Sequence, residues 1–208
     1  MGQRSPMKRT GAIEGNGPEM KIVDISGSNY QDIPDSYFTH SSCKSCLYWE
    51  TEEASLDSKD REALKRKWFN SAGTIFGPCG KLVYHDGKVV AWAQYAPATS
   101  LPNARTYHTY PSEDAYLISC LAVAPGYRQR GIGETLLRAV VDDLRLRGLR
   151  AVETFARRGS PNNPSGPVEF YLKQGFKVKA DDEFLPLLRL DLQQVPIRKR
   201  SIVDLSRN

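Results

Sequence analysis

A glycine-rich turn between an apolar stretch and an amphipathic stretch is the feature of this sequence most suited to chemistry. The turn contains Arg128, Gly131 and Gly133 in the pattern R-x-x-G-x-G. Residues 115–124 before it are apolar, as in a buried strand, and residues 132–147 after it repeat apolar side chains at helical spacing. The first N–H groups of a helix have no partner within it and lie at its positive end. The turn therefore predicts a site for a phosphate or pyrophosphate.

Two other phosphate-binding patterns do not fit the sequence. The chain contains no G-x-x-x-x-G-K-[ST], and no G-x-G-x-x-G that follows a strand and opens a helix. The first absence argues against a P-loop nucleoside triphosphatase. The second argues against a dinucleotide-binding fold.

The turn and a second motif resemble those of the GNAT superfamily, the acetyl-CoA-dependent N-acetyltransferases. From Val123 to Gly133 the sequence reads V-x-P-x-x-R-x-x-G-x-G, and residues 169–176 read E-F-Y-L-K-Q-G-F, similar to the end of the GNAT core. The resemblance covers residues 81–190 and is less specific before them. It implies an α/β (α+β) fold with a mixed, mostly antiparallel central sheet of about six to seven strands, flanked by helices.

The resemblance also implies how acetyl-CoA would bind. In this family the amides of the turn hold the coenzyme pyrophosphate, and the strand before it pairs through its backbone with the pantetheine arm. The residues assigned to these contacts are Leu121, Ala122, Val123, Arg128, Gln129, Arg130, Gly131, Ile132 and Gly133. Many family members have an asparagine seven residues before the tyrosine of the second motif. Here Pro164 stands at that position, and Asn163 is the expected substitute.

Acetyl transfer from a thioester to an amine needs a base for the amine and an acid for the departing thiolate. The resemblance implies that Tyr171, which would also contact the coenzyme, is the acid; a tyrosine that only packs the short helix is the alternative. Glu153, on the strand after the central helix, is the candidate base. Glu113, Asp114 and His108 are alternatives, as is deprotonation through water.

Cys43-x-x-Cys46 has the spacing of half a zinc site. Cys79 and His85 could complete four ligands only if the fold brings them close to this pair. We favour cysteines buried beside the neighbouring aromatic residues and expect no metal, with zinc as the alternative.

The elements that would position these residues follow from periodicity and from turn residues. The helix expected at 58–72 places Leu64 and Trp68 on its buried face. A strong Asp86-Gly87 turn joins two hairpin strands. The expected elements are a strand at 20–25, a helix at 58–72, strands at 81–85, 88–95 and 115–124, a helix at 132–147, a strand at 151–155, a helix at 168–174, and strands at 176–178 and 184–192.

The length of 208 residues fits one domain with tails. We expect a disordered leader at residues 1–19, a single acetyltransferase domain at 20–191 and a basic tail at 192–208. The net charge is +5, of which the leader carries +1 and the tail +3. The near-neutral centre gives little support to a nucleic-acid surface.

The sequence predicts a cytoplasmic enzyme. No apolar run approaches the roughly 20 residues that cross a membrane, and four cysteines fit a reducing compartment. Its partners would be acetyl-CoA and an unidentified primary amine, with a homodimer left open. The alternatives are a catalytically silent acyl-CoA-binding or sensor module of the same fold, and a nucleic-acid-associated protein led by its basic tails.

Overall fold

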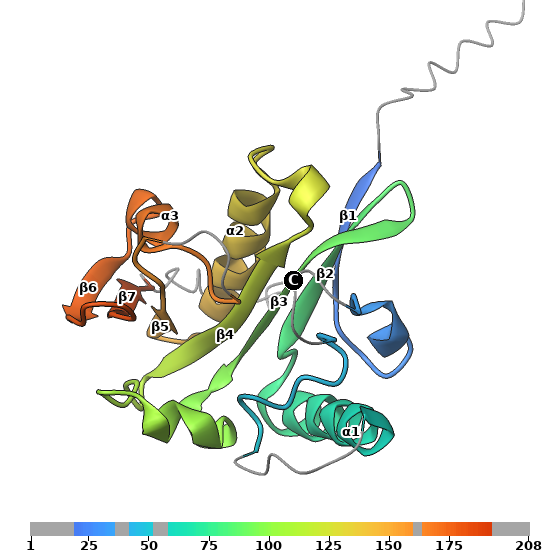
Figure 1. The fold of residues 1–208 in the computed structure, drawn as a ribbon, viewed down its shortest axis with the longest axis horizontal. Coiled ribbons are helices and arrows are strands. Elements are labelled where there is room, and N and C mark those ends of the chain that lie inside the picture. Colours follow the sequence, from blue (N-terminus) through green and yellow to red (C-terminus); the bar gives the residue numbers. More distant parts are fainter. Residues whose placement is uncertain (1–18, 36–41, 52–57, 160–163, 193–208) are drawn as a thin grey trace, which may run out of the picture.

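The structure is a computed structural model that describes residues 19–35, 42–51, 58–159 and 164–192 (Figure 1). Most of the expected leader and tail, at residues 1–18 and 193–208, lies outside these ranges. The elements are β1 (Met20–Asp24), α1 (Ser58–Phe76), β2 (Gly80–His85), β3 (Lys88–Pro97), β4 (Ala115–Val123), α2 (Ile132–Leu146), β5 (Ala151–Phe155), α3 (Val168–Lys173), β6 (Lys177–Ala180) and β7 (Leu187–Asp191).

The seven strands form one mixed sheet in the order β1-β2-β3-β4-β5-β7-β6. Every neighbouring pair is antiparallel except β4 and β5, which are parallel. The helix α2 connects these two strands, as a parallel pair requires. The mixed, mostly antiparallel sheet confirms the expected fold class.

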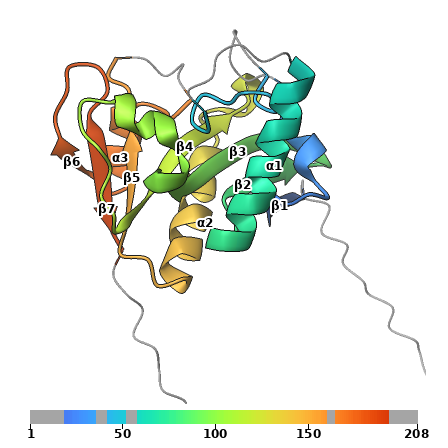
Figure 2. The ribbon, with the colours of Figure 1, turned by 90° about the horizontal axis from the view of Figure 1, so that it is seen from below.

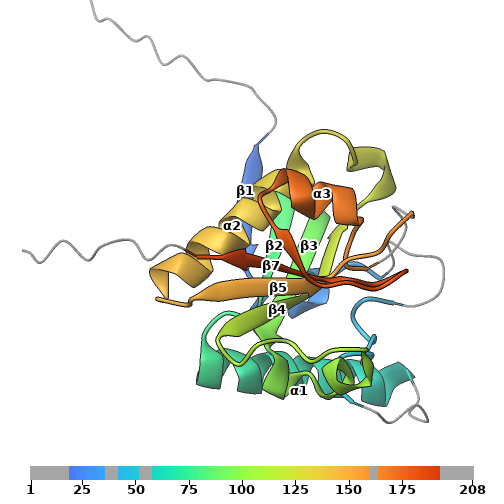
Figure 3. The same ribbon diagram turned by 90° about the vertical axis from the view of Figure 1, so that its left-hand side faces the viewer.

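Helices cover both faces of the sheet. Figure 3 shows α2 and α3 on one face and α1 on the other, and Figure 2 shows α1 lying across the sheet, where it packs against β3. The helix α2 buries Leu136, Val140 and Leu144, three positions of one stripe at a spacing of four. The two faces have separate hydrophobic cores, one under α2 and α3 and one under α1.

The strands β4 and β5 pair over only three residues and then part. Their ladder runs from Ala115 opposite Ala151 to Leu117 opposite Glu153, although β4 continues to Val123. On its other side β4 pairs with β3, and the register shifts by one residue at Ser119. Such a bulge bends a strand and increases its twist. We call residues 118–123 of β4 and 154–155 of β5 the β4–β5 fork.

One expected feature of α1 is wrong. The side chain of Leu64 is 40% exposed and Trp68 is only half-buried, whereas Lys65, Phe69 and Ala72 face the core. The buried stripe is thus shifted by one residue from the predicted one. The reason is a non-local partner for Lys65, described below. The helix also continues four residues beyond the expected end, to Phe76.

Candidate active site

Two residues with left-handed backbone shape the turn between β4 and α2. A single turn of 3-10 helix follows β4, and the Arg128 Nε donates a hydrogen bond to the Val123 carbonyl oxygen at 3.1 Å. The left-handed residues are Gln129, with φ 59°, and Gly131, with φ 77°. A side chain other than glycine is uncommon in this conformation, and such strained positions cluster at ligand sites.

The backbone N–H groups of residues 129–133 have no acceptor among the described residues. They lie at the first turn of α2, a helix of 15 residues whose dipole makes this end positive. The exposed Arg130 adds charge, its guanidinium 5.5 Å from the centroid of the Tyr127 ring. A row of amides with arginines in the same short segment suits a pyrophosphate.

The space beside the turn is open. A Cβ atom on Gly131 would meet no atom within 4 Å, and one on Gly133 would come no closer than 3.5 Å to any other group. Gly131 is therefore favoured by its left-handed backbone and not by crowding. The protein leaves room at the N–H groups that a bound anion would occupy.

The edge of β4 that faces the fork is partly covered by the chain itself. The Leu121 N–H donates a hydrogen bond to the Pro164 carbonyl oxygen at 2.7 Å. Ala122 and Val123, the next two residues, pair with β3 and direct their side chains to opposite faces of the sheet. A ligand that pairs with Leu121, as the sequence predicts for the coenzyme, must displace the Pro164 carbonyl.

Tyr171 lies on the α3 side of the fork and is fully buried. Its ring packs edge-on against Phe170 and Phe176, at centroid distances of 5.0 and 5.1 Å. Its hydroxyl has no hydrogen-bonding partner within the described part of the chain. Burial raises the pKa of Tyr171 well above its usual 10, against a smaller lowering effect from the nearby Thr154 hydroxyl. The hydroxyl keeps its proton at neutral pH and has unused capacity to donate it.

The sequence and the fold both have known counterparts. The sequence profile of the Acetyltransferase (GNAT) family matches residues 40–176. The chain belongs to the GNAT acetyltransferase family. A comparison with curated protein sequences finds no match.

Several solved structures have the same fold at low sequence identity. An N-acetyltransferase from Staphylococcus aureus Mu50 is 15% identical, with a TM-score of 0.57 over 84% of this chain and 99% of that chain. YncA, a putative acetyltransferase from Salmonella typhimurium solved with acetyl-CoA, is 16% identical, with a TM-score of 0.54 over 85% and 96%. Ard1 from Thermoplasma volcanium is 15% identical, with a TM-score of 0.53 over 84% and 98%.

Glu153, the candidate base, is held in an ion-pair network and is poorly placed to take a proton. Its carboxylate accepts hydrogen bonds from the Ser112 N–H at 2.9 Å and hydroxyl at 2.7 Å, from Lys179 at 2.9 Å and from Arg189 at 3.0 Å. Burial alone would raise the pKa of Glu153, but these donors together lower it below 4.5. A carboxylate with four donors and a lowered pKa is a weak base, so the structure favours a structural role for Glu153.

Of the other candidate bases, Glu113 is exposed on the surface, whereas Asp114 and His108 contact charged groups. Asp114 accepts two hydrogen bonds from Arg189, at 2.9 and 3.0 Å. The Nδ1 of His108 is 3.8 Å from a carboxylate oxygen of Asp182. Asn163, the expected coenzyme contact, lies outside the described residues.

The structure does not assemble the zinc site that the cysteine spacing left open. Cys79 and His85 flank β2 at opposite ends, about 20 Å apart at the usual rise of a strand. Among the described residues, no three His, Cys, Asp or Glu side chains are grouped closely enough to hold a metal ion. Cys43 and Trp49 lie in the core under α1, as expected, whereas Cys46 is only half-buried and Tyr48 is 49% exposed.

A buried polar cluster on the α1 face is the feature that sequence reasoning missed. Lys65 of α1 is 1% exposed, and its Nζ donates hydrogen bonds to Glu50 at 2.5 Å and to Gln94 of β3 at 2.6 Å. We call these three residues the Glu50 cluster. No local pattern marks them, because Lys65 sits in a helix that is rich in charged residues and its partners are 15 and 29 residues away.

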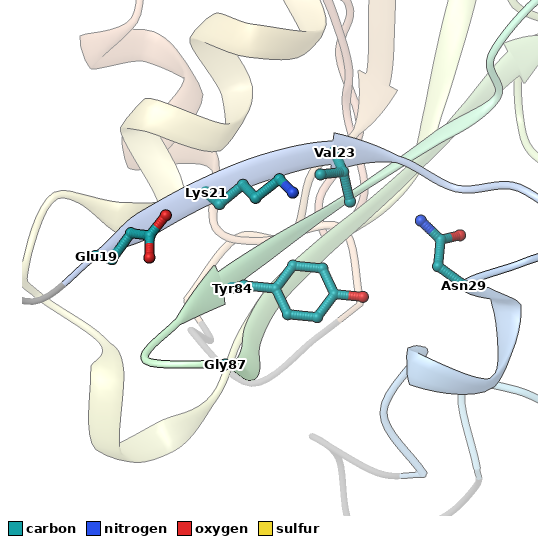
Figure 4. Close-up of a pocket in the computed structure, with 6 residues that line it drawn as sticks. All are labelled: Glu19, Lys21, Val23, Asn29, Tyr84 and Gly87. Atoms are coloured by element: carbon teal, nitrogen blue, oxygen red, sulfur yellow. The ribbon is translucent and has the colours of Figure 1, made fainter.

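Figure 4 shows a hollow at the edge of the sheet, on the outer strands β1 and β2. It has a volume of about 420 Å³ and is lined by Glu19, Lys21, Val23, Asn29, Tyr84 and Gly87. The only tyrosine there, Tyr84, is bound through its hydroxyl to Asp32. The hollow lies on β1 and β2, so it offers nothing to the fork.

Within the described ranges, no helix combines the length and apolarity needed to cross a membrane.

Proposed function

We propose that this protein transfers an acetyl group from acetyl-CoA to a primary amine. The observation that carries the proposal is the row of N–H groups at residues 129–133, which lack acceptors in the described structure and stand at the positive end of α2. The fork opens from the same strand that leads into this turn. Acetyl-CoA would supply the activated acetyl thioester.

Different groups of the protein would bind different parts of the coenzyme. The amides of residues 129–133 would bind the pyrophosphate, with Arg128 and Arg130 adding charge. The backbone of Leu121, Ala122 and Val123 would orient the pantetheine arm after the Pro164 carbonyl has moved. Asn163 stays a proposed contact from the sequence alone.

We assign the proton donor to Tyr171. Its Oη is buried, without a partner among the described residues, and protonated at neutral pH because burial raises its pKa. The same burial keeps water from competing for the hydroxyl. Tyr171 Oη would hold a proton at the fork until a leaving thiolate needs it.

We also place the protein in the cytoplasm. All four cysteines are free thiols in the structure, with Cys43, Cys79 and Cys120 buried. Free thiols persist in a reducing compartment. The location and any homodimer are proposals that fractionation and light scattering would test.

A thiol-release screen tests the activity directly. The full chain is mixed with acetyl-CoA and a library of small amines, polyamines, amino acids and peptides, and released coenzyme A is measured against a no-amine blank. We expect at least one amine to raise the rate well above the blank. Coenzyme-dependent stabilisation with no turnover across the library would instead favour a silent acyl-CoA-binding module.

A further inference from the structure

The Glu50 cluster places three polar side chains in the core under α1. Glu50 Oε1 accepts hydrogen bonds from Lys65 Nζ and from the Gln94 Nε2, both at 2.5 Å. The side chains of Lys65 and Glu50 are 2% and 3% exposed, and Gln94 is fully buried. Three elements contribute: the segment 42–51, α1 and β3. The contacts fix one carboxylate oxygen of Glu50 firmly.

The second carboxylate oxygen of Glu50 differs from the first, because no donor reaches it from the described residues. Oε2 is buried and lacks a hydrogen-bonding partner among the described residues. Buried polar atoms in native proteins are nearly always bonded, and an ionised oxygen without donors is costly. An exception of this kind calls for an explanation, such as a catalytic role.

The position of the cluster relates Oε2 to the fork. Gln94 is paired across the β3–β4 ladder with Cys120, the residue after the bulge at Ser119. Cys120 lies in the core under α1 and is close enough to feel the charges of Lys65 and Glu50. Tyr171 packs in the core on the opposite face of the sheet. The Glu50 cluster and Tyr171 thus stand on the two faces of the sheet at the point where β4 leaves β5.

Aromatic rings connect the segment that carries Glu50 to the end of β5. Trp49 stacks on Tyr107 with centroids 5.3 Å apart, and Tyr107 stacks on Phe155 with centroids 4.1 Å apart. Phe155 is the last residue of β5 and one wall of the fork. The stack thus leads from the residue next to Glu50 to the fork, and aromatic faces attract an alkylammonium as a carboxylate does.

We propose that Glu50 Oε2 binds the ammonium group of the acceptor amine and takes its proton. In this step one N–H bond of the ammonium breaks and an O–H bond forms on Oε2. The electron pair stays on nitrogen, which leaves a neutral nucleophilic amine. Lys65 and Gln94 keep Oε1 in place, so Oε2 is the oxygen without a protein donor that is left for the acceptor. The proposal rests on the proposed acetyltransferase function and supplies the base that Glu153 does not.

Binding of a simple amine to the coenzyme-free protein tests this assignment without relying on turnover. The probe is n-butylammonium chloride, titrated into the full ¹⁵N-labelled chain at constant ionic strength, with n-butanol as the neutral control. The signals of the three tryptophan indole N–H groups are followed by NMR. We expect the Trp49 signal to shift in a saturable way with n-butylammonium, at an affinity at least tenfold higher than with n-butanol.

Two variants locate the binding group. Glu50→Gln is expected to weaken n-butylammonium binding at least tenfold. Glu62→Gln, on the outer part of α1 where Glu62 bonds Gln31, is expected to leave it unchanged. Because Glu50→Gln leaves Lys65 without its counter-ion, the double variant Glu50→Gln/Lys65→Met serves if the single one unfolds, and it must lose binding to the same extent.

The wild-type titration alone can overturn the proposal. Equal responses to n-butylammonium and n-butanol, or full affinity in a folded Glu50 variant, would show that Oε2 is not the ammonium site. Stabilisation by acetyl-CoA is measured in the same samples, and it depends on the turn at residues 129–133. If acetyl-CoA does not stabilise the wild-type protein, that result counts against the proposed function, whatever the ammonium titration shows.

Discussion

Replacing Glu153 by glutamine separates a structural carboxylate from a catalytic one. The substitution keeps the size of the side chain and one acceptor oxygen, so Ser112 can still donate to it. It removes the negative charge and turns an amide NH₂ group toward Lys179 or Arg189. The network then holds cations without their central counter-ion, and the protein should lose stability.

The size of the loss follows from the burial of the partners. Removing one member of a buried ion pair costs about 3–5 kcal/mol. The Glu153 side chain is fully buried, but Lys179 and Arg189 are 33% and 21% exposed and can recover some hydration. We therefore expect the low end, about 3 kcal/mol. For a domain of this size, that lowers the melting temperature by about 6–12 °C.

The pH dependence of stability is a second, independent test of the role of Glu153. The pKa of Glu153 is lower in the folded protein than the usual 4.5, so its stabilising contribution is fully present above about pH 4.5. The contribution is lost as the pH falls through the folded pKa. The stability gap between wild type and Glu153→Gln should be constant from pH 8 to 5 and shrink on further acidification, as measured by denaturant melts at each pH. A variant that melts like the wild type but has lost turnover would refute this reasoning and restore Glu153 as the base.

Three further predictions test the coenzyme site, the proton donor and the choice of buried side chains on α1. Gly131→Asp, which adds a negative charge and a side chain at φ 77°, should abolish thermal stabilisation by acetyl-CoA, whereas Gly126→Asp, at an open position earlier in the turn, should largely retain it. Tyr171→Phe should lower kcat by roughly 10²–10⁴-fold on any amine found by the screen, with unchanged coenzyme affinity; full kcat would exclude the hydroxyl as the acid. Phe69→Ala should cost about 3–5 kcal/mol in a urea melt, and Leu64→Ala less than about 0.5 kcal/mol; the reverse order would show that the buried stripe of α1 is misplaced.

Local signals in the sequence predicted most of the fold and the turn. The Asp86-Gly87 pair joins β2 and β3, and both residues have the positive φ angles, 49° and 74°, that this tight turn needs. The glycines and arginines before α2 lie within one short segment, so their neighbourhood is set by sequence proximity. For the same reason the strand, turn and helix around Gly131 could be read without a structure.

Contacts between distant segments explain what the sequence could not predict. Two stripes of side chains on α1 could face the core. The stripe with Lys65 is buried because Glu50 neutralises the ammonium group and Gln94 accepts a further hydrogen bond from it. The tendency of apolar side chains to be buried favours the other stripe, which contains Leu64. In the same way, the engagement of the Leu121 N–H depends on Pro164, which reaches β4 from 43 residues along the chain.

The bulge at Ser119 decides which groups face each side of the fork. Along a regular strand, residues two apart share a face, so Leu117 and Leu121 would lie on the same side. In the structure Leu117 packs in the core under α1 and Leu121 in the core under α2, because the extra residue reverses the alternation. Cys120 is thereby turned toward the Glu50 cluster, while Leu121 faces the side of Tyr171. The bulge thus lies where β4 leaves β5, between the proposed proton acceptor on one face of the sheet and the proposed proton donor on the other.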